Sequence, residues 1–258
     1  MSRLQAILWD VDGTLAETER DGHRTAFNRA FQTLNLPWRW EEARYGELLA
    51  VTGGRERLLA DMATRSDAPA TAAEREALAR ELHALKNRYY AELVEAAQLP
   101  LRPGVSGLMK EALERGLRMA ITTTTSRSNV DALMKVHLGA DWQSNFAAVV
   151  CGEDVKAKKP DPEVYLIALA QLQLQPLETV AIEDSPGGVA AARAAEVPVI
   201  VARSAYFADA TLEGAIAIGP GLHTRQGWRP ALRGADGPVG IDDLQAWHAQ
   251  MDTVSQFG

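Results

Sequence analysis

Short, almost uninterrupted apolar segments recur along the chain, and each ends at a glycine, a proline or a polar residue. The segments of strand length are residues 5–9, 117–122, 147–151, 179–183 and 198–202. Strands that are buried on both faces show this continuous pattern, whereas half-exposed strands alternate apolar and polar residues. The pattern therefore predicts a sheet that is covered on both sides.

Helical periodicity occupies the stretches between the later apolar segments. Helices are predicted at about residues 105–115, 129–136, 162–172 and 187–195, with Pro162 near a helix start and Gly116 just past a helix end. Strands that alternate with helices are typical of parallel sheets. We therefore expect an α/β fold with a Rossmann-like, doubly wound parallel sheet.

The first two predicted strands are separated by roughly a hundred residues, although a crossover between parallel strands needs only a dozen or so. The pattern of this segment is helical throughout, at residues 19–34, 41–49, 55–62 and 72–97. In the last of these, one helical face carries Leu78, Leu82, Leu85, Tyr89 and Leu93. We expect an inserted, all-helical cap domain at residues 17–99, with Trp38 and Trp40 in its core. Residues 1–16 and 100–258 then form the core domain, with hinges near residues 15–17 and 99–103.

We expect neither a signal peptide nor a membrane-spanning segment in this sequence. The apolar run at residues 6–9 stops at Asp10 and is much shorter than the apolar part of a signal peptide, and about eighteen apolar residues never run together. The tail after Tyr206 is rich in glycine and proline around residues 219–240 and is predicted to end in a helix at residues 242–251. We expect a cytoplasmic protein with no membrane partner.

Composition narrows the function classes further. The chain is 47% hydrophobic, which suffices for a sizeable core, and its net charge of -7 argues against a broad surface for nucleic acid. A single cysteine, Cys151, cannot form an internal disulfide, and we expect it to be a small core residue. The five histidines lack the spacing of a structural zinc site.

Polar residues of complementary chemistry follow four of the predicted strands. Residues 10–14 read Asp-Val-Asp-Gly-Thr, residues 122–126 are four threonines and a serine, residues 158–162 read Lys-Lys-Pro-Asp-Pro, and residues 183–185 read Glu-Asp-Ser. In open α/β sheets, ligands bind outside the carboxyl ends of the strands. We therefore expect these residues to meet in one crevice.

The two acidic pairs in this set predict a metal site and a phosphoryl-transfer reaction. Asp10 and Asp12 repel each other unless a divalent cation lies between them and the facing pair, Glu183 and Asp184, and we expect Mg²⁺ there. Asp10 is expected to attack phosphorus, while Asp12 protonates the leaving oxygen and then activates water. The predicted reaction is a displacement through an aspartyl-phosphate.

An anionic nucleophile that attacks a phosphate also needs nearby positive charge and hydrogen-bond donors. Lys159 and the metal are expected to supply the charge, and Lys158 is expected to be its solvated neighbour. Thr123, the adjacent Thr124 and nearby backbone N–H groups are expected to hold the phosphate oxygens. Gly13 would let the chain turn sharply beside the phosphate.

The order of these four motifs resembles that of the haloacid dehalogenase-type phosphohydrolase superfamily. A helical cap between the first and second motifs resembles the subgroup that contains β-phosphoglucomutase and small sugar-phosphate phosphatases. The resemblance implies a nucleophile at Asp10, an acid/base at Asp12, the second-motif hydroxyl at Thr123 and the phosphate lysine at Lys159. It also implies metal ligation by Asp10, the Asp12 carbonyl and Asp184, with Glu183 touching the metal or orienting a water bound to it.

Residues 17–24 and 52–57 resemble the CbbY group, whose members remove the 1-phosphate from xylulose 1,5-bisphosphate, an inhibitor of Rubisco. The resemblance implies a cap that closes over the sugar, with Glu17 accepting its hydroxyls. His23 is expected to bind substrate or position the acid/base, or else to be a partly buried polar residue near the hinge. Arg55 and the backbone N–H of Gly54 are expected to bind the second phosphate. Arg24, Arg44 and Arg57 are expected to be surface ion-pair partners.

Two other functions fit the same motifs. A phosphomutase uses the same aspartyl-phosphate but returns the phosphoryl group to the sugar. A non-catalytic module would use the same scaffold to bind a phosphate. The leading prediction is a Mg²⁺-dependent sugar-phosphate phosphatase; the sequence does not predict its oligomeric state or which sugar phosphate it prefers.

Overall fold

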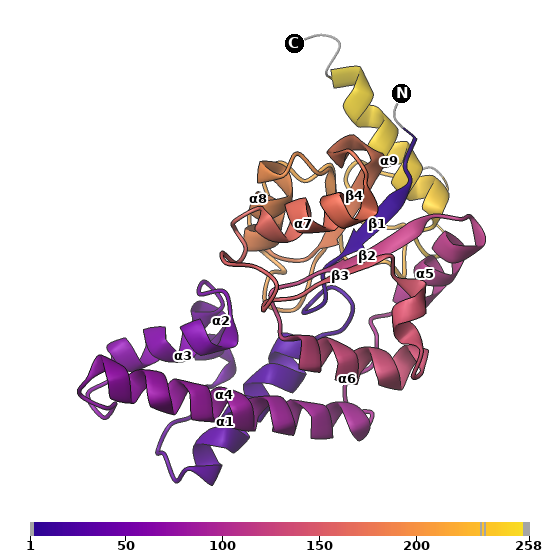
Figure 1. Cartoon of the computed structure of the whole chain (residues 1–258). Helices are drawn as coiled ribbons and strands as arrows, with labels where there is room; N and C mark the ends of the chain where they lie inside the picture. The colour runs from indigo at the N-terminus through magenta and orange to yellow at the C-terminus, as the bar shows by residue number, and fades with distance from the viewer. Residues whose placement is uncertain (1–2, 233, 235, 255–258) are drawn as a thin grey trace.

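One parallel sheet of six strands organises the computed structural model, which describes residues 3–232, 234 and 236–254 (Figure 1). The strand order is β3-β2-β1-β4-β5-β6. The strands are β1 Ala6–Trp9, β2 Arg118–Thr122, β3 Ala148–Val150, β4 Thr179–Glu183, β5 Val199–Ala202 and β6 Ala217–Gly219. The first five lie within the predicted segments, and the predicted α/β class is confirmed. Strand β6 was not predicted, because its three residues are too few to show a pattern.

The parallel register brings the carboxyl ends of the central strands to one edge of the sheet. Trp9 of β1 is paired with Ile121 of β2 on one side and with Ile182 of β4 on the other. Asp10 follows Trp9 directly, so it lies between the ends of β2 and β4. This register is what places the first, second and fourth motifs together.

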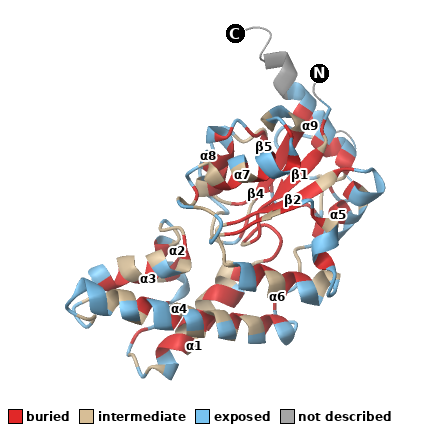
Figure 2. Cartoon of the chain, in the orientation of Figure 1, coloured by how far each residue is buried: buried red, intermediate tan, exposed pale blue. Residues whose placement is uncertain are grey.

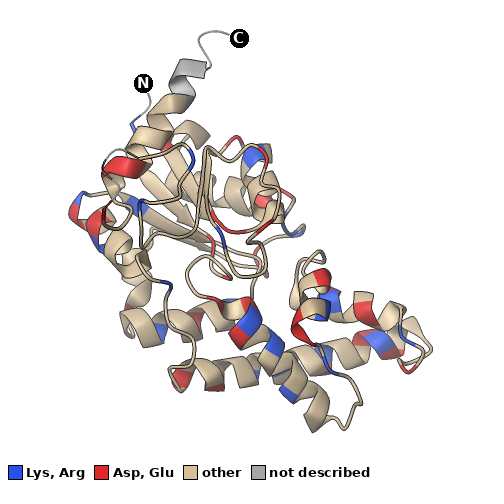
Figure 3. Cartoon of the chain, turned by 180° about the vertical axis from the view of Figure 1, so that it is seen from behind, with Lys and Arg blue, Asp and Glu red and all other residues tan. Residues whose placement is uncertain are grey.

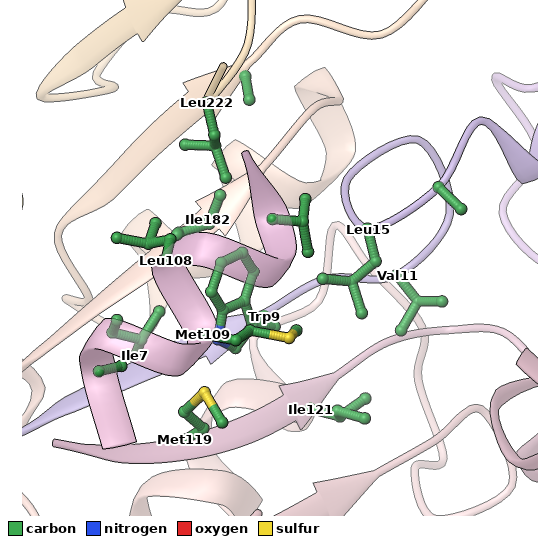
Figure 4. Packing of buried hydrophobic residues seen from close by; sticks show 14 of the residues in the cluster. Ile7, Trp9, Val11, Leu15, Leu108, Met109, Met119, Ile121, Ile182 and Leu222 are labelled. Carbon is green, nitrogen blue, oxygen red and sulfur yellow. The ribbon is translucent and has the colours of Figure 1, made fainter. Parts of the chain in front are cut away.

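Alternate residues of each strand face two different layers of helices. Ile7 and Trp9 pack with Leu108 and Met109 of α5 (Figure 4), while Ala6 belongs to the cluster under the opposite layer. The first layer contains α5 Val105–Glu114, α6 Arg127–Leu138 and α9 Ile241–Val254, and the second contains α7 Glu163–Leu172 and α8 Pro186–Ala194. Figure 2 shows the strands buried between these helices. Each large side chain buried in this way contributes roughly 1.5–3 kcal/mol.

The long segment between β1 and β2 is helical, as predicted, and has a core of its own. Its helices are α1 Arg24–Thr33, α2 Glu42–Leu48, α3 Gly54–Ala63 and α4 Ala72–Glu95, which lie together apart from the sheet (Figure 1). The ring of Trp40 packs 4.8 Å from that of Phe27 and 5.0 Å from that of Phe31. Trp38 and Trp40 are buried in this cluster, which confirms their prediction. The exact division into two domains with two hinges stays a prediction.

Two features of the insert differ from the sequence analysis. The first predicted helix is divided, because a π-helical turn at Glu19–His23 precedes α1. The buried face of α4 runs through Leu82, Lys86 and Tyr90, at the four-residue spacing of one helical face. Leu78, Leu85 and Tyr89 are only partly buried. A lysine therefore occupies a position on the inner face of the insert.

The tail packs onto the core as α9. The ring of Trp247 in α9 lies 4.6 Å from that of Trp228, and the backbone N–H of Ile241 donates to Glu111 of α5 over 3.1 Å. The predicted terminal helix is therefore confirmed, with a slightly greater length. Within the described residues, none of the helices has the length and apolar character needed to span a bilayer.

Candidate active site

Three carboxylates gather at the carboxyl edge of the sheet. Asp10 follows β1, Glu183 ends β4 and Asp184 follows it, and one oxygen from each lies within 4.8 Å of the others. The backbone N–H of Asp10 donates to the carbonyl of Ile182 over 3.1 Å, which fixes this spacing. The sheet itself therefore sets the distance between the acidic groups.

Lys159 reaches the same point from the segment that follows β3. Its Nζ lies 2.8 Å from Asp10 Oδ1, 2.6 Å from Glu183 Oε1 and 2.8 Å from the carbonyl oxygen of Thr122. Tyr165 of α7 donates its hydroxyl to the same Glu183 oxygen over 2.5 Å. Burial alone would lower the pKa of Lys159, but the charges of Asp10 and Glu183 raise it well above its ordinary value. Lys159 is thus a fixed cation against one oxygen of Asp10.

The other charged groups beside Lys159 are carboxylates. Burial and Glu183 raise the pKa of Asp10 to about 7, although Lys159 acts in the opposite direction. Burial, Asp10 and Glu183 likewise raise the pKa of Asp184 well above its ordinary value. A divalent cation would offset this excess of negative charge, and a donor set made of oxygens alone suits Mg²⁺. The residues present therefore fit the predicted metal.

Asp12 is held by different partners, which come from the start of the insert. Its Oδ1 accepts hydrogen bonds from Thr18 over 2.6 Å and from Nε2 of the buried His23 over 2.9 Å. Burial alone would raise the pKa of Asp12, but the charge of His23 and these hydrogen bonds lower it well below its ordinary value. The two aspartates of the first motif thus have opposite pKa shifts.

Gly13 makes the turn between these aspartates and the insert. Its φ is +85°, and a Cβ at this position would lie 2.0 Å from Asp184 Oδ2 and 3.2 Å from Cβ of Ser204. Only glycine fits here without displacing Asp184. The first motif therefore turns in contact with the fourth.

A cleft of about 1310 Å³ opens over these groups and is lined by both the sheet edge and the insert. Of the residues predicted to act on a phosphate, the lining includes Asp10, Asp12, His23, Gly54, Arg55, Thr124, Lys159 and Asp184. Glu17 is not in this lining within the described chain: its Oε1 lies 3.5 Å from Nε of Arg102, and its Oε2 accepts the backbone N–H of Ala205 over 3.3 Å.

Some of the four consecutive threonines at residues 122–125 are buried, and others line the cleft. Thr123 is buried, and its hydroxyl oxygen accepts the backbone N–H of Thr125 over 3.2 Å. Thr124 and Thr125 line the cleft. Thr123 therefore shapes the loop in this structure, and Thr124 is the more accessible of the two predicted threonines.

The cations of the insert are placed differently from the sequence analysis. Arg55 lines the cleft, but its side chain is 46% exposed and its Nη1 pairs with Glu76 over 3.1 Å. Arg57 is buried and donates to the hydroxyl of Tyr45 over 2.6 Å, with Glu19 3.4 Å away. The prediction of Arg57 as a surface residue is wrong, because α3 turns its side chain inward toward α2.

Lys86 is a second buried cation in this wall, and the sequence analysis missed it. It lines the cleft from α4, and burial lowers its pKa to about 8 although Asp12 and Glu19 act to raise it. Its spacing of four residues from Leu82 was the signal that placed it on the inner face of the helix. Figure 3 shows that charges of both signs lie along the helices of the insert.

An ion pair between Lys158 and Glu56 joins the core to the insert. Nζ of Lys158 lies 2.8 Å from Oε1 of Glu56, and the Lys158 side chain is 25% exposed. Lys158 is thus partly solvated, as expected of a neighbour of Lys159, and it also pairs with Glu56 of α3, which was not predicted. Cys151 is buried as predicted, and burial raises the pKa of its thiol to about 12.

Comparison with known proteins decides the family. Residues 4–196 match the haloacid dehalogenase-like hydrolase family. The chain belongs to this family. The protein CbbY from a plasmid of Cupriavidus necator is 43% identical over 251 residues, which cover 95% of this chain and 97% of that protein.

Two crystal structures of CbbY from Rhodobacter sphaeroides share the fold of this hydrolase. The complex with phosphate is 38% identical, with a TM-score of 0.76 over 82% of this chain and 92% of that one. The D10N mutant in complex with xylulose 1,5-bisphosphate is 37% identical, with a TM-score of 0.79 over 84% and 94% of the two chains. The predicted family, fold class and enzyme class, a phosphatase of the haloacid dehalogenase type, are confirmed.

Proposed function

We propose that this hydrolase is a Mg²⁺-dependent sugar-phosphate phosphatase that acts on xylulose 1,5-bisphosphate or a similar sugar bisphosphate. The observation that carries the proposal is the contact of Lys159 with Asp10 beside Glu183 and Asp184, at the base of a cleft shared with the insert. The similarity to a CbbY structure that binds xylulose 1,5-bisphosphate supports the substrate class.

Asp10 is the proposed nucleophile. Lys159 binds its Oδ1, which leaves Oδ2 to attack phosphorus. The bond from this oxygen to phosphorus forms as the bond from phosphorus to the ester oxygen breaks, and the leaving oxygen takes a proton from the carboxyl group of Asp12. Water then attacks the aspartyl-phosphate, Asp12 takes the proton from that water, and inorganic phosphate leaves with the Asp10 carboxylate restored.

The hydrogen bonds at Asp12 support its role as base in the second step. His23 and Thr18 keep this carboxyl group ionised in the structure, so the acid step requires it to gain a proton first. The negative charge of a bound phosphate beside Asp12 acts in that direction, since it disfavours a second negative charge. His23 is thus proposed to set the protonation of Asp12.

Asp10, Asp184 and the carbonyl of Asp12 are the proposed ligands of Mg²⁺, with Glu183 beside them. The bound cation supplies charge neutralisation for the approach of Asp10 to a phosphate dianion. Lys159 and the backbone beside Thr124 hold the phosphate oxygens. This arrangement aims positive charge at the oxygens whose negative charge grows during the transfer.

The wall formed by the insert offers sites for a second phosphate. Arg55 and Gly54 were predicted there, and the structure adds Arg57 and Lys86 as buried cations in the same cleft. Guanidinium groups bind phosphate through paired donors. These cations support a substrate with a second phosphate at this wall, in preference to a sugar monophosphate whose uncharged end would lie there.

Turnover assays test the proposal. Hydrolysis of p-nitrophenyl phosphate and of xylulose 1,5-bisphosphate is expected with Mg²⁺ and not with excess EDTA, and Asp10→Asn is expected to abolish both. Activity retained in Asp10→Asn would show that the nucleophile is a different residue. No turnover of either substrate by the wild type would overturn the proposal and favour a phosphate-binding module.

Incubation with β-glucose 1-phosphate and a catalytic amount of a sugar bisphosphate separates the phosphatase from a phosphomutase. The phosphatase is expected to release inorganic phosphate. Net glucose 6-phosphate with little inorganic phosphate would identify a mutase, since both reactions use the same aspartyl-phosphate.

A further inference from the structure

Arg102 joins several segments around the site, although it has no part in the mechanism above. It lies between α4 and α5, where the chain returns from the insert to the core. Its backbone N–H donates to the carbonyl of Leu15 over 2.7 Å, and the preceding residue, Leu101, forms an isolated β-bridge with Ala16. The two connecting segments between the insert and the core thus run side by side at Arg102.

The side chain of Arg102 is 11% exposed, and its guanidinium group donates to three backbone carbonyls. Nη1 donates to the carbonyl of Gly13 and, over 2.9 Å, to that of Ala202, and Nη2 donates to that of Arg203 over 2.5 Å. Gly13 belongs to the turn after Asp12, whereas Ala202 and Arg203 are at the end of β5. One side chain therefore ties the first-motif turn to the neighbouring strand end.

Nε of Arg102 faces a fourth partner. It lies 3.5 Å from Oε1 of Glu17, whose other oxygen accepts the backbone N–H of Ala205. Glu17 is thereby attached to the same loop after β5 that Arg102 binds through Arg203. The position of this carboxylate relative to the sheet depends on the arginine.

The segments that Arg102 joins meet the proposed metal ligands directly. A Cβ on Gly13 would lie 2.0 Å from Asp184 Oδ2 and 3.2 Å from Cβ of Ser204, so the turn packs against both residues without a gap. A shift of the Gly13 carbonyl would therefore change the distance between Asp12 and Asp184.

We propose that Arg102 is a positioning residue for phosphoryl transfer, which holds the Asp12–Gly13 turn at a fixed distance from Asp184 through the carbonyls of Gly13 and Arg203. The proposal rests on the proposed function, since it concerns the geometry of that reaction. An arginine suits the task because its planar group carries five donors that reach carbonyls in several directions. A lysine at this position would keep the charge but serve these carbonyls from a single nitrogen.

The alternative is a purely structural role, and the two roles differ in what they change. Misplacement of a reacting group by about 1 Å can lower kcat about 100-fold without a matching change in KM. A residue that only stabilises the fold lowers the melting temperature and leaves kcat of the folded enzyme unchanged. The value of kcat for the folded enzyme, compared separately with KM and with the melting temperature, therefore distinguishes the two roles.

Arg118 offers a matched control. It is partly exposed, and its Nη1 donates to the backbone carbonyl of Leu172 over 2.7 Å, at the start of β2 and thus at the opposite edge of the sheet from the site. Arg118→Met removes a comparable side chain and a comparable bond to a carbonyl. It is expected to lower stability and to leave kcat unchanged.

The experiment measures kcat and KM for p-nitrophenyl phosphate, together with the melting temperature, for the wild type, Arg102→Met, Arg102→Lys, Arg102→Ala and Arg118→Met. Arg102→Met is expected to lose about 100-fold in kcat with little change in KM. Arg102→Lys is expected to recover part of this loss, and added guanidinium chloride at millimolar concentration is expected to raise kcat of Arg102→Ala alone.

A kcat of folded Arg102→Met equal to that of Arg118→Met would overturn the inference. If Arg102→Met does not fold, the other two variants decide. The inference would be overturned if Arg102→Lys had the kcat of the wild type, or if guanidinium did not raise the kcat of Arg102→Ala. Failure of the proposed function looks different, because the wild type itself would then not hydrolyse p-nitrophenyl phosphate.

Discussion

The two walls of the cleft hold their charged groups in different ways. On the side of the sheet, Asp10, Lys159 and Glu183 are buried, and Lys159 lies 2.8 Å from Asp10 and 2.6 Å from Glu183. On the side of the insert, Arg55 is 46% exposed and Glu56 36% exposed, and the pairs they form are 2.8 to 4.0 Å long. Buried charges cannot lose a partner without a large cost, whereas exposed pairs exchange easily with water or a ligand.

This difference separates the chemistry from recognition. The nucleophile and its acidic neighbours are fixed by strand ends, whereas Asp12 also depends on hydrogen bonds from Thr18 and His23 of the insert. The half-exposed cations over the cleft are free to exchange a glutamate for the phosphate of a substrate. Arg57 and Lys86 are intermediate, because they belong to the insert but are buried within it. The comparison predicts large effects of substitution at the sheet and small effects on the insert.

The adjacent lysines Lys159 and Lys158 give the largest expected contrast. Lys159→Met leaves Asp10 and Glu183 without their cation and is expected to lower kcat/KM by about 10³-fold or more. Lys158→Met breaks only the partly exposed pair with Glu56 and is expected to change kcat/KM by less than about tenfold. Steady-state hydrolysis of p-nitrophenyl phosphate checks both. Similar losses in the two variants would contradict the proposed division between the walls.

A glycine substitution tests how tightly the sheet side is packed. Gly13→Ala places a Cβ in contact with Asp184 Oδ2 and is expected to reduce kcat about 100-fold. Gly116→Ala is the control, since Gly116 also has a positive φ, +72°, but no atom lies within 4 Å of the added Cβ. Both variants are expected to lose about 1–2 kcal/mol of stability. Denaturant unfolding and kcat measured side by side separate backbone strain from displacement of Asp184. Unchanged kcat in Gly13→Ala would show that the turn has room to move.

The same contrast explains which parts of the site could be predicted from sequence. Asp10, Glu183 and Asp184 stand at the ends of continuous apolar segments, so the rule that parallel strands end at one edge was enough to bring them together. The positions of Arg57 and Lys86 depend on how helices far apart in the chain pack against one another. Periodicity marked the helices and could place Lys86 on the face of Leu82, but it could not show that this face lines the cleft.

Elements of the fold divide in the same way. The first five strands and the helices around them were predicted because their apolar periods are long or uninterrupted. The π-helical turn at Glu19–His23 has no period of its own, and β6 is too short to show one. The contact of Lys158 with Glu56 joins residues 102 positions apart, so no local pattern indicates it.

Acid sensitivity on the insert side provides a third test. Burial, with Lys86 and Lys158 nearby, lowers the pKa of His83 from 6.5 to about 4. Between these pH values the unfolded chain binds a proton that the folded chain does not, so stability falls as the pH falls. His83 is expected to account for a loss of about 2.5 kcal/mol between pH 6.5 and pH 4.

Urea unfolding of His83→Gln across this pH range measures that contribution. The variant is expected to lose less stability than the wild type as the pH falls. His223→Gln, which alters an exposed histidine, is the control and is expected to keep the wild-type slope. Parallel curves for wild type and His83→Gln would show that His83 titrates normally in the folded protein.

The ion pair between Glu56 and Lys158 is expected to give the smallest effect, although it joins the two walls. Because both side chains are partly exposed, a double-mutant cycle with Glu56→Gln and Lys158→Met is expected to give a coupling free energy below about 1 kcal/mol. The coupling should decrease in about 1 M salt, because salt screens an ion pair that is open to solvent much more than a buried one. Urea unfolding of the four proteins at low and high salt provides both values. A coupling that exceeds about 2 kcal/mol and resists salt would mean that this pair behaves like the buried pairs of the sheet, and that the insert wall is fixed as well.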